Sequence, residues 1–263
     1  MKELKDIINC IEARFPLSLA EEWDNSGIQV DTGRPVSRIL VALEATDEVV
    51  DEAIERGADL IVTHHPLLFS PVSSIDWREP VMERLMGLIR AGISVYSTHT
   101  PFDIGQGGMN DLIGFRFGMR EIAPMDGGDP YCRKGLLREP ISVLELARLA
   151  AERLKVPAEG IRIIGDPDRV VTEAAWCGGA GADFMENAVR AGFEVFMTGD
   201  VKYHQARRAE ELGLCVIDAG HFGTEKLFTA AMADLLRTSL QEDVEVLQAE
   251  SLEDPFRYLN TNE

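Results

Sequence analysis

Two adjacent histidines, His64 and His65, follow the apolar run at residues 60–63 and precede Pro66. Neighbouring side chains on a strand point to opposite faces, so one metal ion would not be bound well by both imidazoles. Two metal ions would suit the pair, because each imidazole could bind its own ion, with about 3.5–4 Å between the metals. The alternative is that His65 caps a turn while His64 packs in the core, and the pair by itself favours this alternative.

Other side chains with metal-binding atoms lie at similar places in the chain. Asp103 follows a predicted strand, in a loop that Pro101 turns away from it. His221 and Glu225 are spaced i, i+4, so a helix that begins just after Gly220 would place both on one face. Imidazoles combined with carboxylates suit Zn, Fe, Mn, Ni or Co better than Ca or Mg. We therefore predict that two divalent ions, of Zn, Fe, Mn, Ni or Co, are bound by five residues: His64, His65, Asp103, His221 and Glu225.

Two metal ions at this distance predict hydrolysis. A water molecule that bridges them would have its pKa lowered to about 7, which supplies hydroxide at neutral pH. We expect a dinuclear metal-dependent hydrolase that acts through a metal-bridging hydroxide on a small molecule, with a nucleotide as one candidate. His99 lies close in sequence to Asp103 and is the predicted catalytic residue, although it could also orient a ligand or fill space. The same three roles are open for His204.

Both halves of the chain show the same order of predicted elements, strand–helix–strand–helix–strand. One constant shift aligns Gly57 with Gly192 and Thr63 with Thr198, which indicates a duplication. Alternating strands and helices predict an α/β fold with parallel sheets covered on both faces, and ligands bind beyond the carboxyl ends of such strands. The predicted strands are residues 38–43, 59–63, 93–98, 172–177, 194–198 and 214–219, with helices at 47–57, 80–92, 183–192 and 202–213 and a last strand at 243–247.

The duplication also predicts the domain organisation. We expect a first α/β half at residues 1–118, a connector rich in glycine, proline and charge at 119–140, and a second α/β half at 141–263. In the second half, the glycine-rich turn at 178–181 precedes a predicted helix. Its backbone N–H groups could bind a phosphate, but close packing would explain the glycines equally well.

Composition limits the partners and the compartment. The net charge of −19 argues against nucleic acid and anionic membrane surfaces as partners. No apolar run approaches the roughly 18 residues that a membrane span needs, and the first residues do not have the pattern of a secretory signal. The four cysteines are scattered without a CxxC pair, so disulfides and a thiolate zinc site are not expected. We expect a cytoplasmic protein.

Several stretches, taken in order, resemble a known family, the GTP cyclohydrolase I type 2 homologues or NIF3-like proteins. The resemblance covers nearly the whole chain, and the HH and GHxxTE elements carry most of it. The stretches are WDNSGIQV (23–30), DLIVTHHPLLF (59–69), STHTPFD (97–103), GGMND (107–111), GGAG (178–181), TGDVKYH (198–204) and AGHFGTE (219–225).

The resemblance implies a fold, a metal site and an assembly. It implies duplicated βαβαβ halves that form an intertwined two-lobed NIF3-like fold without a central insert domain, for which the connector is too short. It implies a dinuclear site and a toroidal homohexamer built as a trimer of dimers. The family's ligands fall on the same residues as the prediction from spacing: His64, His65, Asp103, His221 and Glu225.

The family name implies opening of the purine ring of GTP with release of formate. The chain lacks the paired cysteines of a thiolate-bound zinc cyclohydrolase, and its nearby candidates for binding a triphosphate are Lys202, Arg133 and Lys134. The alternative function is a non-catalytic, metal-binding ring scaffold that binds partner proteins. A shared fold does not choose between the two.

Overall fold

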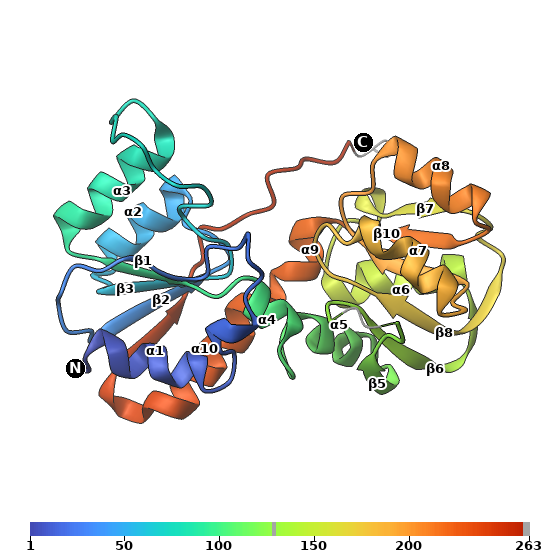
Figure 1. The fold of residues 1–263 in the computed structure, drawn as a ribbon, viewed down its shortest axis with the longest axis horizontal. Helices are drawn as coiled ribbons and strands as arrows, with labels where there is room; N and C mark the ends of the chain where they lie inside the picture. The colour runs from blue at the N-terminus through green and yellow to red at the C-terminus, as the bar shows by residue number, and fades with distance from the viewer. Residues whose placement is uncertain (128–129, 260–263) are drawn as a thin grey trace. The chain divides into compact units, whose positions relative to one another are not determined.

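The computed structural model describes residues 1–127 and 130–259 (Figure 1). Their contacts form two compact units. Unit 1 comprises Met1–Gln106 and Phe228–Glu253, and unit 2 comprises Gly107–Leu227 together with residues 254–259. Each unit has its own β-sheet and its own helices, so the predicted α/β class is confirmed.

Unit 1 is built on a five-stranded sheet in the order β1-β4-β3-β2-β11. Strands β2, β3, β4 and β11 are parallel, and β1 pairs with β4 in the antiparallel direction. Side chains from α2 and α3 pack with the sheet in one apolar core, and Figure 1 shows α1 and α10 on the opposite side of this sheet. The strands are β1 (Gly27–Val30), β2 (Arg38–Ala42), β3 (Leu60–Thr63), β4 (Ser94–Ser97) and β11 (Glu245–Gln248); the helices are α1 (Leu4–Glu12), α2 (Asp47–Glu55), α3 (Pro80–Ala91), α4 (Thr100–Ile104) and α10 (Leu227–Leu240), with 3-10 turns at Leu17–Leu19 and Gln241–Asp243.

Local sequence signals explain the helices of the unit 1 repeat. The Thr46 side chain accepts a hydrogen bond from the Val49 N–H at 3.3 Å and thereby caps α2. Helix α3 begins at Pro80, where a missing N–H costs nothing, and ends at Gly92, which adopts φ = +76°. The helices therefore start and stop within two residues of the predicted bounds.

Unit 2 is built on a six-stranded sheet in the order β5-β6-β8-β9-β10-β7. The repeat strands β8, β9 and β10 are parallel, and α7 and α8 pack against one face through a second apolar core. The strands are β5 (Arg120–Pro124), β6 (Arg133–Ser142), β7 (Arg162–Ile164), β8 (Val170–Trp176), β9 (Val195–Thr198) and β10 (Cys215–Asp218); the helices are α5 (Met109–Phe117), α6 (Val143–Leu154), α7 (Met185–Arg190), α8 (Tyr203–Glu211) and α9 (His221–Glu225), with 3-10 turns at Ala158–Gly160 and Ala182–Phe184.

The structure differs from the sequence prediction in three ways. The last strand, predicted within the second half, is β11 and pairs with β2 in the sheet of unit 1. Both sheets are mixed, because β1 in unit 1 and β5, β6 and β7 in unit 2 pair in the antiparallel direction. The segment 119–140, predicted to be a connector, contains β5 and most of β6. Gly135 and Pro140 interrupt the apolar alternation of β6, so its pairing with β8 was not visible in the sequence.

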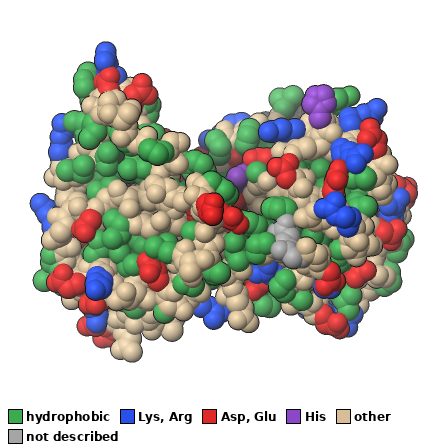
Figure 2. Space-filling view, in the orientation of Figure 1, with side chains coloured by type: hydrophobic (Ala, Val, Ile, Leu, Met, Phe, Trp, Pro, Cys, Tyr) green, Lys and Arg blue, Asp and Glu red, His purple; other side chains and the backbone are tan. Residues whose placement is uncertain are grey.

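The surface and the helix lengths add two observations. Figure 2 shows acidic and basic side chains interspersed on the visible face of each unit, so the charge on this face is not gathered in one patch. Among the described residues, no helix combines the length and the apolar character that crossing a membrane requires.

Candidate metal centre

In each unit, the third strand of the repeat leads into a helix of five residues that carries a predicted carboxylate ligand. Helix α4 follows β4 and carries Asp103, and α9 follows β10 and carries Glu225. Helix α9 begins at His221, directly after Gly220, as predicted. Asp103 was expected in a loop but lies in a helix, because Pro101 is tolerated in the first turn of α4.

The adjacent histidines lie beyond the end of β3, where strand alternation no longer applies. The backbone N–H groups of His64 and His65 both donate to the carbonyl oxygen of Leu43, at 3.1 and 2.9 Å. This turn leaves the two ring centroids 5.0 Å apart. One ring nitrogen from each of His64, His65 and His99 lies within 4.8 Å of the other two. The three imidazoles are thus a group in unit 1 that could hold a metal ion.

The hydrogen bonds of His64 fix which of its nitrogens could bind a metal. Its Nδ1 lies 3.1 Å from the carbonyl oxygen of Thr98, which can only accept, so Nδ1 carries the proton. In the neutral ring, Nε2 then has a lone pair, and it lies 3.5 Å from Oδ1 of Asp103. His64 is fully buried. A buried lone pair and a carboxylate oxygen repel each other, and either a proton or a metal ion between them removes this repulsion. This pair could therefore hold a metal ion.

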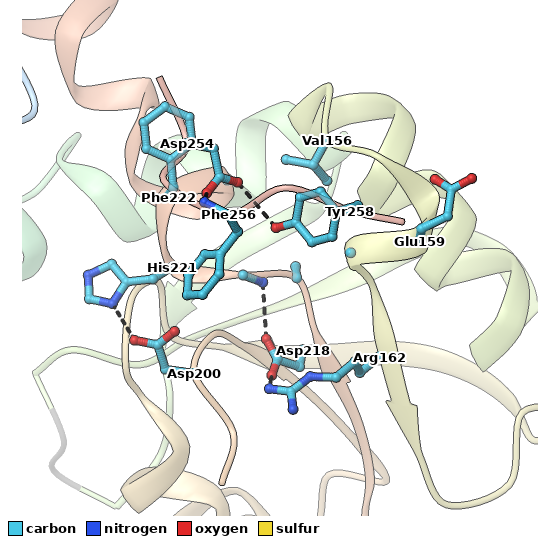
Figure 3. Close-up of a pocket in the computed structure, with 14 residues that line it drawn as sticks. Val156, Glu159, Arg162, Asp200, Asp218, His221, Phe222, Asp254, Phe256 and Tyr258 are labelled. Carbon is cyan, nitrogen blue, oxygen red and sulfur yellow. Dashed lines mark hydrogen bonds and ion pairs between the residues drawn. The ribbon is translucent and has the colours of Figure 1, made fainter. Parts of the chain in front are cut away.

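Unit 2 repeats this arrangement with His221. Its Nδ1 lies 2.9 Å from Oδ2 of Asp200, and its Nε2 lies 2.8 Å from Oε2 of Glu225. Figure 3 shows Asp200 and His221 joined through that first contact. Carboxylate–histidine pairs of this kind orient the metal-binding nitrogen in known metal sites. His221 and Glu225 therefore form a second pair that fits a metal ion.

The pKa of His221 reports the negative charge around it. Burial by itself would lower this pKa, but hydrogen bonds and charge from Glu225 and Asp200 outweigh burial and raise the pKa to about 10. The metal-free site therefore holds a proton where a metal ion would bind. Asp200 adopts φ = +55°, which is rare for a residue other than glycine and is typical of functional sites.

His99 has its own carboxylate partner, which sequence reasoning missed. Its Nδ1 lies 3.0 Å from Oδ1 of Asp24. Burial would raise the pKa of Asp24, but hydrogen bonds from His99, Thr100 and Ser26 hold it well below its usual range. Asp24 lies in the WDNSGIQV stretch, and nothing in its spacing connects it with His99, 75 positions away. Asp200, in TGDVKYH, was missed for the same reason.

The glycine-rich turn at 178–181 is not a phosphate site. The N–H groups of Gly178, Gly179 and Gly181 donate to side-chain oxygens of Asn110, Thr224 and Thr198 at 2.8, 3.0 and 2.9 Å. A side chain at position 179 would collide with Oε1 of Glu225. The phosphate hypothesis is therefore wrong, and close packing explains the glycines: Gly179 lies against Glu225, Gly178 against Ile113 and Gly181 against Cys177.

The residues proposed to bind a triphosphate, and His204, have other contacts in the structure. Arg133 is buried and donates to Asp111 at 2.6 Å, and Lys134 pairs with Asp126, so neither is placed to bind a triphosphate. Lys202 and His204 are exposed at the start of α8. His204 makes a T-shaped contact with Tyr203 and does not belong to a His and acid group among the described residues.

A cavity in unit 2 lies beside His221. It has a volume of about 280 Å³, and its wall includes both His221 and Asp200 (Figure 3). Phe256 and Tyr258 from the last described residues line it as well, and the Tyr258 hydroxyl donates to Asp254 at 3.2 Å. Unit 2 therefore has room for a small molecule next to one of its predicted ligands.

Comparison with known proteins places the chain in a family. The model of the Duf34/NIF3 (NGG1p interacting factor 3) family matches residues 2–255. The chain belongs to this family. A family member from Clostridium perfringens, named GTP cyclohydrolase 1 type 2 homolog, is 36% identical, over 98% of this chain and 100% of its own length. The predicted resemblance is thereby confirmed.

Two solved structures show the same fold. A Bacillus cereus protein described as related to NIF3 has a TM-score of 0.91 at 23% identity, over 98% of this chain and 99% of its own. A protein called ybgI, described as of unknown function, has a TM-score of 0.86 at 27% identity, over 97% of this chain and 100% of its own. The NIF3-like fold predicted from the sequence is confirmed.

The titration of His221 tests the charge around it. In the metal-free protein, we expect its imidazole to titrate near pH 10 and not near its ordinary 6.5. The charged ring then stabilises the metal-free fold fully below about pH 6.5, and this contribution is lost as the pH rises through about 10. Asp200→Asn should lower the midpoint, because it removes one negative neighbour. Histidine ¹⁵N NMR measures the midpoint, and Asp183→Asn, an exposed site in unit 2, should leave it unchanged. A wild-type midpoint near 6.5 contradicts the expectation.

Two glycine variants separate backbone strain from the collision with Glu225. Gly179 and Gly192 both have positive φ, but a side chain at 192 meets nothing within 4 Å. Alanine should cost about 1 kcal/mol of unfolding free energy at Gly192 through strain alone. Gly179→Ala should cost more and should also reduce bound metal, because it displaces the Glu225 carboxylate. Urea unfolding and elemental analysis measure both effects. Equal results for the two variants would contradict this role of Gly179.

Proposed function

We propose that this NIF3 family protein is a metal-dependent hydrolase with a dinuclear site. In this proposal, the ligands of the two divalent ions are His64, His65 and Asp103 of unit 1 and His221 and Glu225 of unit 2. One observation carries this proposal. In each unit, Nδ1 of a histidine forms a hydrogen bond, and Nε2 of the same ring lies close to a carboxylate oxygen. The distance from Nε2 to the oxygen is 3.5 Å for His64 in unit 1 and 2.8 Å for His221 in unit 2.

The chemistry of these atoms selects the metal and the reaction class. Imidazole and carboxylate ligands favour Zn, Fe, Mn, Ni or Co. Two such ions supply Lewis-acid activation of water near neutral pH, which is the chemistry of hydrolysis. Other residues of the chain orient the ligands. The Thr98 carbonyl and the Asp200 carboxylate accept hydrogen bonds from Nδ1 of His64 and of His221 and so fix the two rings. His99, beside the unit 1 ligands, is the proposed catalytic residue.

The substrate and the assembly belong to the same proposal. The name GTP cyclohydrolase 1 type 2 homolog, carried by relatives, points to a nucleotide as the first substrate to test. The cavity of unit 2 beside His221 is compatible with a small molecule. We include the homohexamer, a trimer of dimers, that the family resemblance implies.

Metal content tests the ligand assignment. His65→Ala should weaken metal binding by more than about 100-fold, since loss of a direct ligand should exceed the 10–100-fold cost of losing a partner behind a ligand. His204→Ala removes an exposed histidine outside the proposed set and should keep the wild-type metal content. Elemental analysis and calorimetric titration measure this, and circular dichroism checks the fold. Unchanged metal in His65→Ala would remove that ligand from the site.

Turnover tests the reaction. We expect metal-loaded protein to hydrolyse a substrate from a panel that includes GTP, monitored by formate release, and phosphate esters, monitored by phosphate release. Glu225→Gln should reduce the rate at least about 100-fold, because the amide is a poorer metal ligand than the carboxylate. A rate that survives this change belongs to a contaminant. Tight metal binding without turnover of any substrate would replace the hydrolase by the metal-binding scaffold.

A further inference from the structure

We propose that Asp24 is a positioning residue that locks the tautomer of His99, so that the Nε2 lone pair of His99 orients the attacking water. The last step rests on the proposed hydrolase function. The tautomer lock does not, because it follows from contacts within unit 1.

Asp24 is held by an unusual number of donors. Its side chain is fully buried, and Oδ1 lies 3.0 Å from Nδ1 of His99. Its Oδ2 accepts hydrogen bonds from the Ser26 hydroxyl at 2.7 Å, from the Thr100 hydroxyl at 2.6 Å and from the Thr100 N–H at 3.2 Å. The carboxylate therefore cannot turn, and it presents one fixed acceptor to His99.

The ring of His99 is fixed on its other sides as well. The rings of Trp23 and Phe69 contact it in T-shaped geometry, with centroids 5.8 and 6.0 Å away. The rings of His64 and His65 contact it in the same geometry at 5.1 and 5.5 Å. Because Nδ1–H donates to Asp24, the neutral ring keeps its lone pair on Nε2. This ring contacts the rings of His64 and His65, which the proposed site uses.

This placement fits an acceptor of a hydrogen bond. A water molecule bound near His64 and His65 has two protons to donate, and a neighbouring lone pair can fix its orientation for attack. His99 accepts such a proton only in the Nδ1–H tautomer. In the opposite tautomer Nε2 becomes a donor, and the orientation of the water is lost.

Asp24→Asn reverses the tautomer with little change in shape. The Thr100 N–H can only donate, so the Asn oxygen should stay in the Oδ2 position, where it keeps this bond. The Asn NH₂ group then faces His99, and Nδ1 must accept. The proton moves to Nε2, and long-range ¹H–¹⁵N correlation spectra of the zinc-loaded protein should show this directly.

The matched control is Asp59→Asn, which removes the same charge from another carboxylate of unit 1. Asp59 accepts from the Ser37 N–H, the Ser37 hydroxyl and the Arg38 N–H at 2.7, 2.7 and 3.0 Å. It lies at the start of β3, whereas the ligand histidines follow its end. Asp59→Asn should leave the tautomer of His99, the metal content and the turnover unchanged.

Four measurements decide the proposal. Asp24→Asn should flip the His99 tautomer, keep the metal stoichiometry and lower kcat about 100-fold with a smaller change in KM. It should also shift the visible spectrum of cobalt-substituted protein, and this readout needs no substrate. A wild-type His99 in the Nε2–H tautomer would overturn the lock. A flipped tautomer with an unchanged cobalt spectrum and wild-type turnover would overturn the role of His99. Absence of turnover in the wild type, with the cobalt shift present, would refute the hydrolase and with it the orientation of an attacking water, and would leave the tautomer lock in place.

Discussion

The site depends on one interaction, the hydrogen bond from Nδ1 of an imidazole to a fixed oxygen. His64 donates to the Thr98 carbonyl, and His221 and His99 donate to the carboxylates of Asp200 and Asp24. In the neutral ring, each bond decides which nitrogen keeps a lone pair and where it points. Without these three acceptors, each imidazole could exchange between its two tautomers. The tautomers of these histidines are therefore set by residues that need not touch a metal.

The repeat explains how one architecture supplies both carboxylates. In each unit, three parallel strands run in the order of the sequence, and the third leads into a short helix with an acidic residue. The carboxyl ends of parallel strands share an edge, so the residues that follow them gather there. The two units differ in which element supplies the histidine that faces the carboxylate. The histidine that faces Asp103 is His64, which follows β3. The histidine that faces Glu225 is His221, which lies on the same helix as Glu225.

Packing at the ligands also accounts for residues that resemble functional motifs. The glycines at 178–181 read as a phosphate-binding turn, yet their N–H groups are bonded to side chains, and Gly179 makes room for Glu225. Arg133 resembles an anion-binding residue, but it is buried against Asp111. Local composition cannot separate a ligand-binding residue from a packed one, because the sequence does not show whether an N–H group or a guanidinium is already bonded within the protein.

The sequence by itself determined the repeat elements, the helix that starts after Gly220 and the family, because apolar periodicity, capping residues and contiguous motifs are local signals. It also singled out the histidines and carboxylates, because their types are unusual at strand ends. Only the tertiary structure decided the antiparallel strands β5 and β6, the return of β11 to the sheet of unit 1, and the pairing of Asp24 with His99. These depend on contacts between residues far apart in the chain, and no local pattern encodes which distant partner a strand or a carboxylate will find.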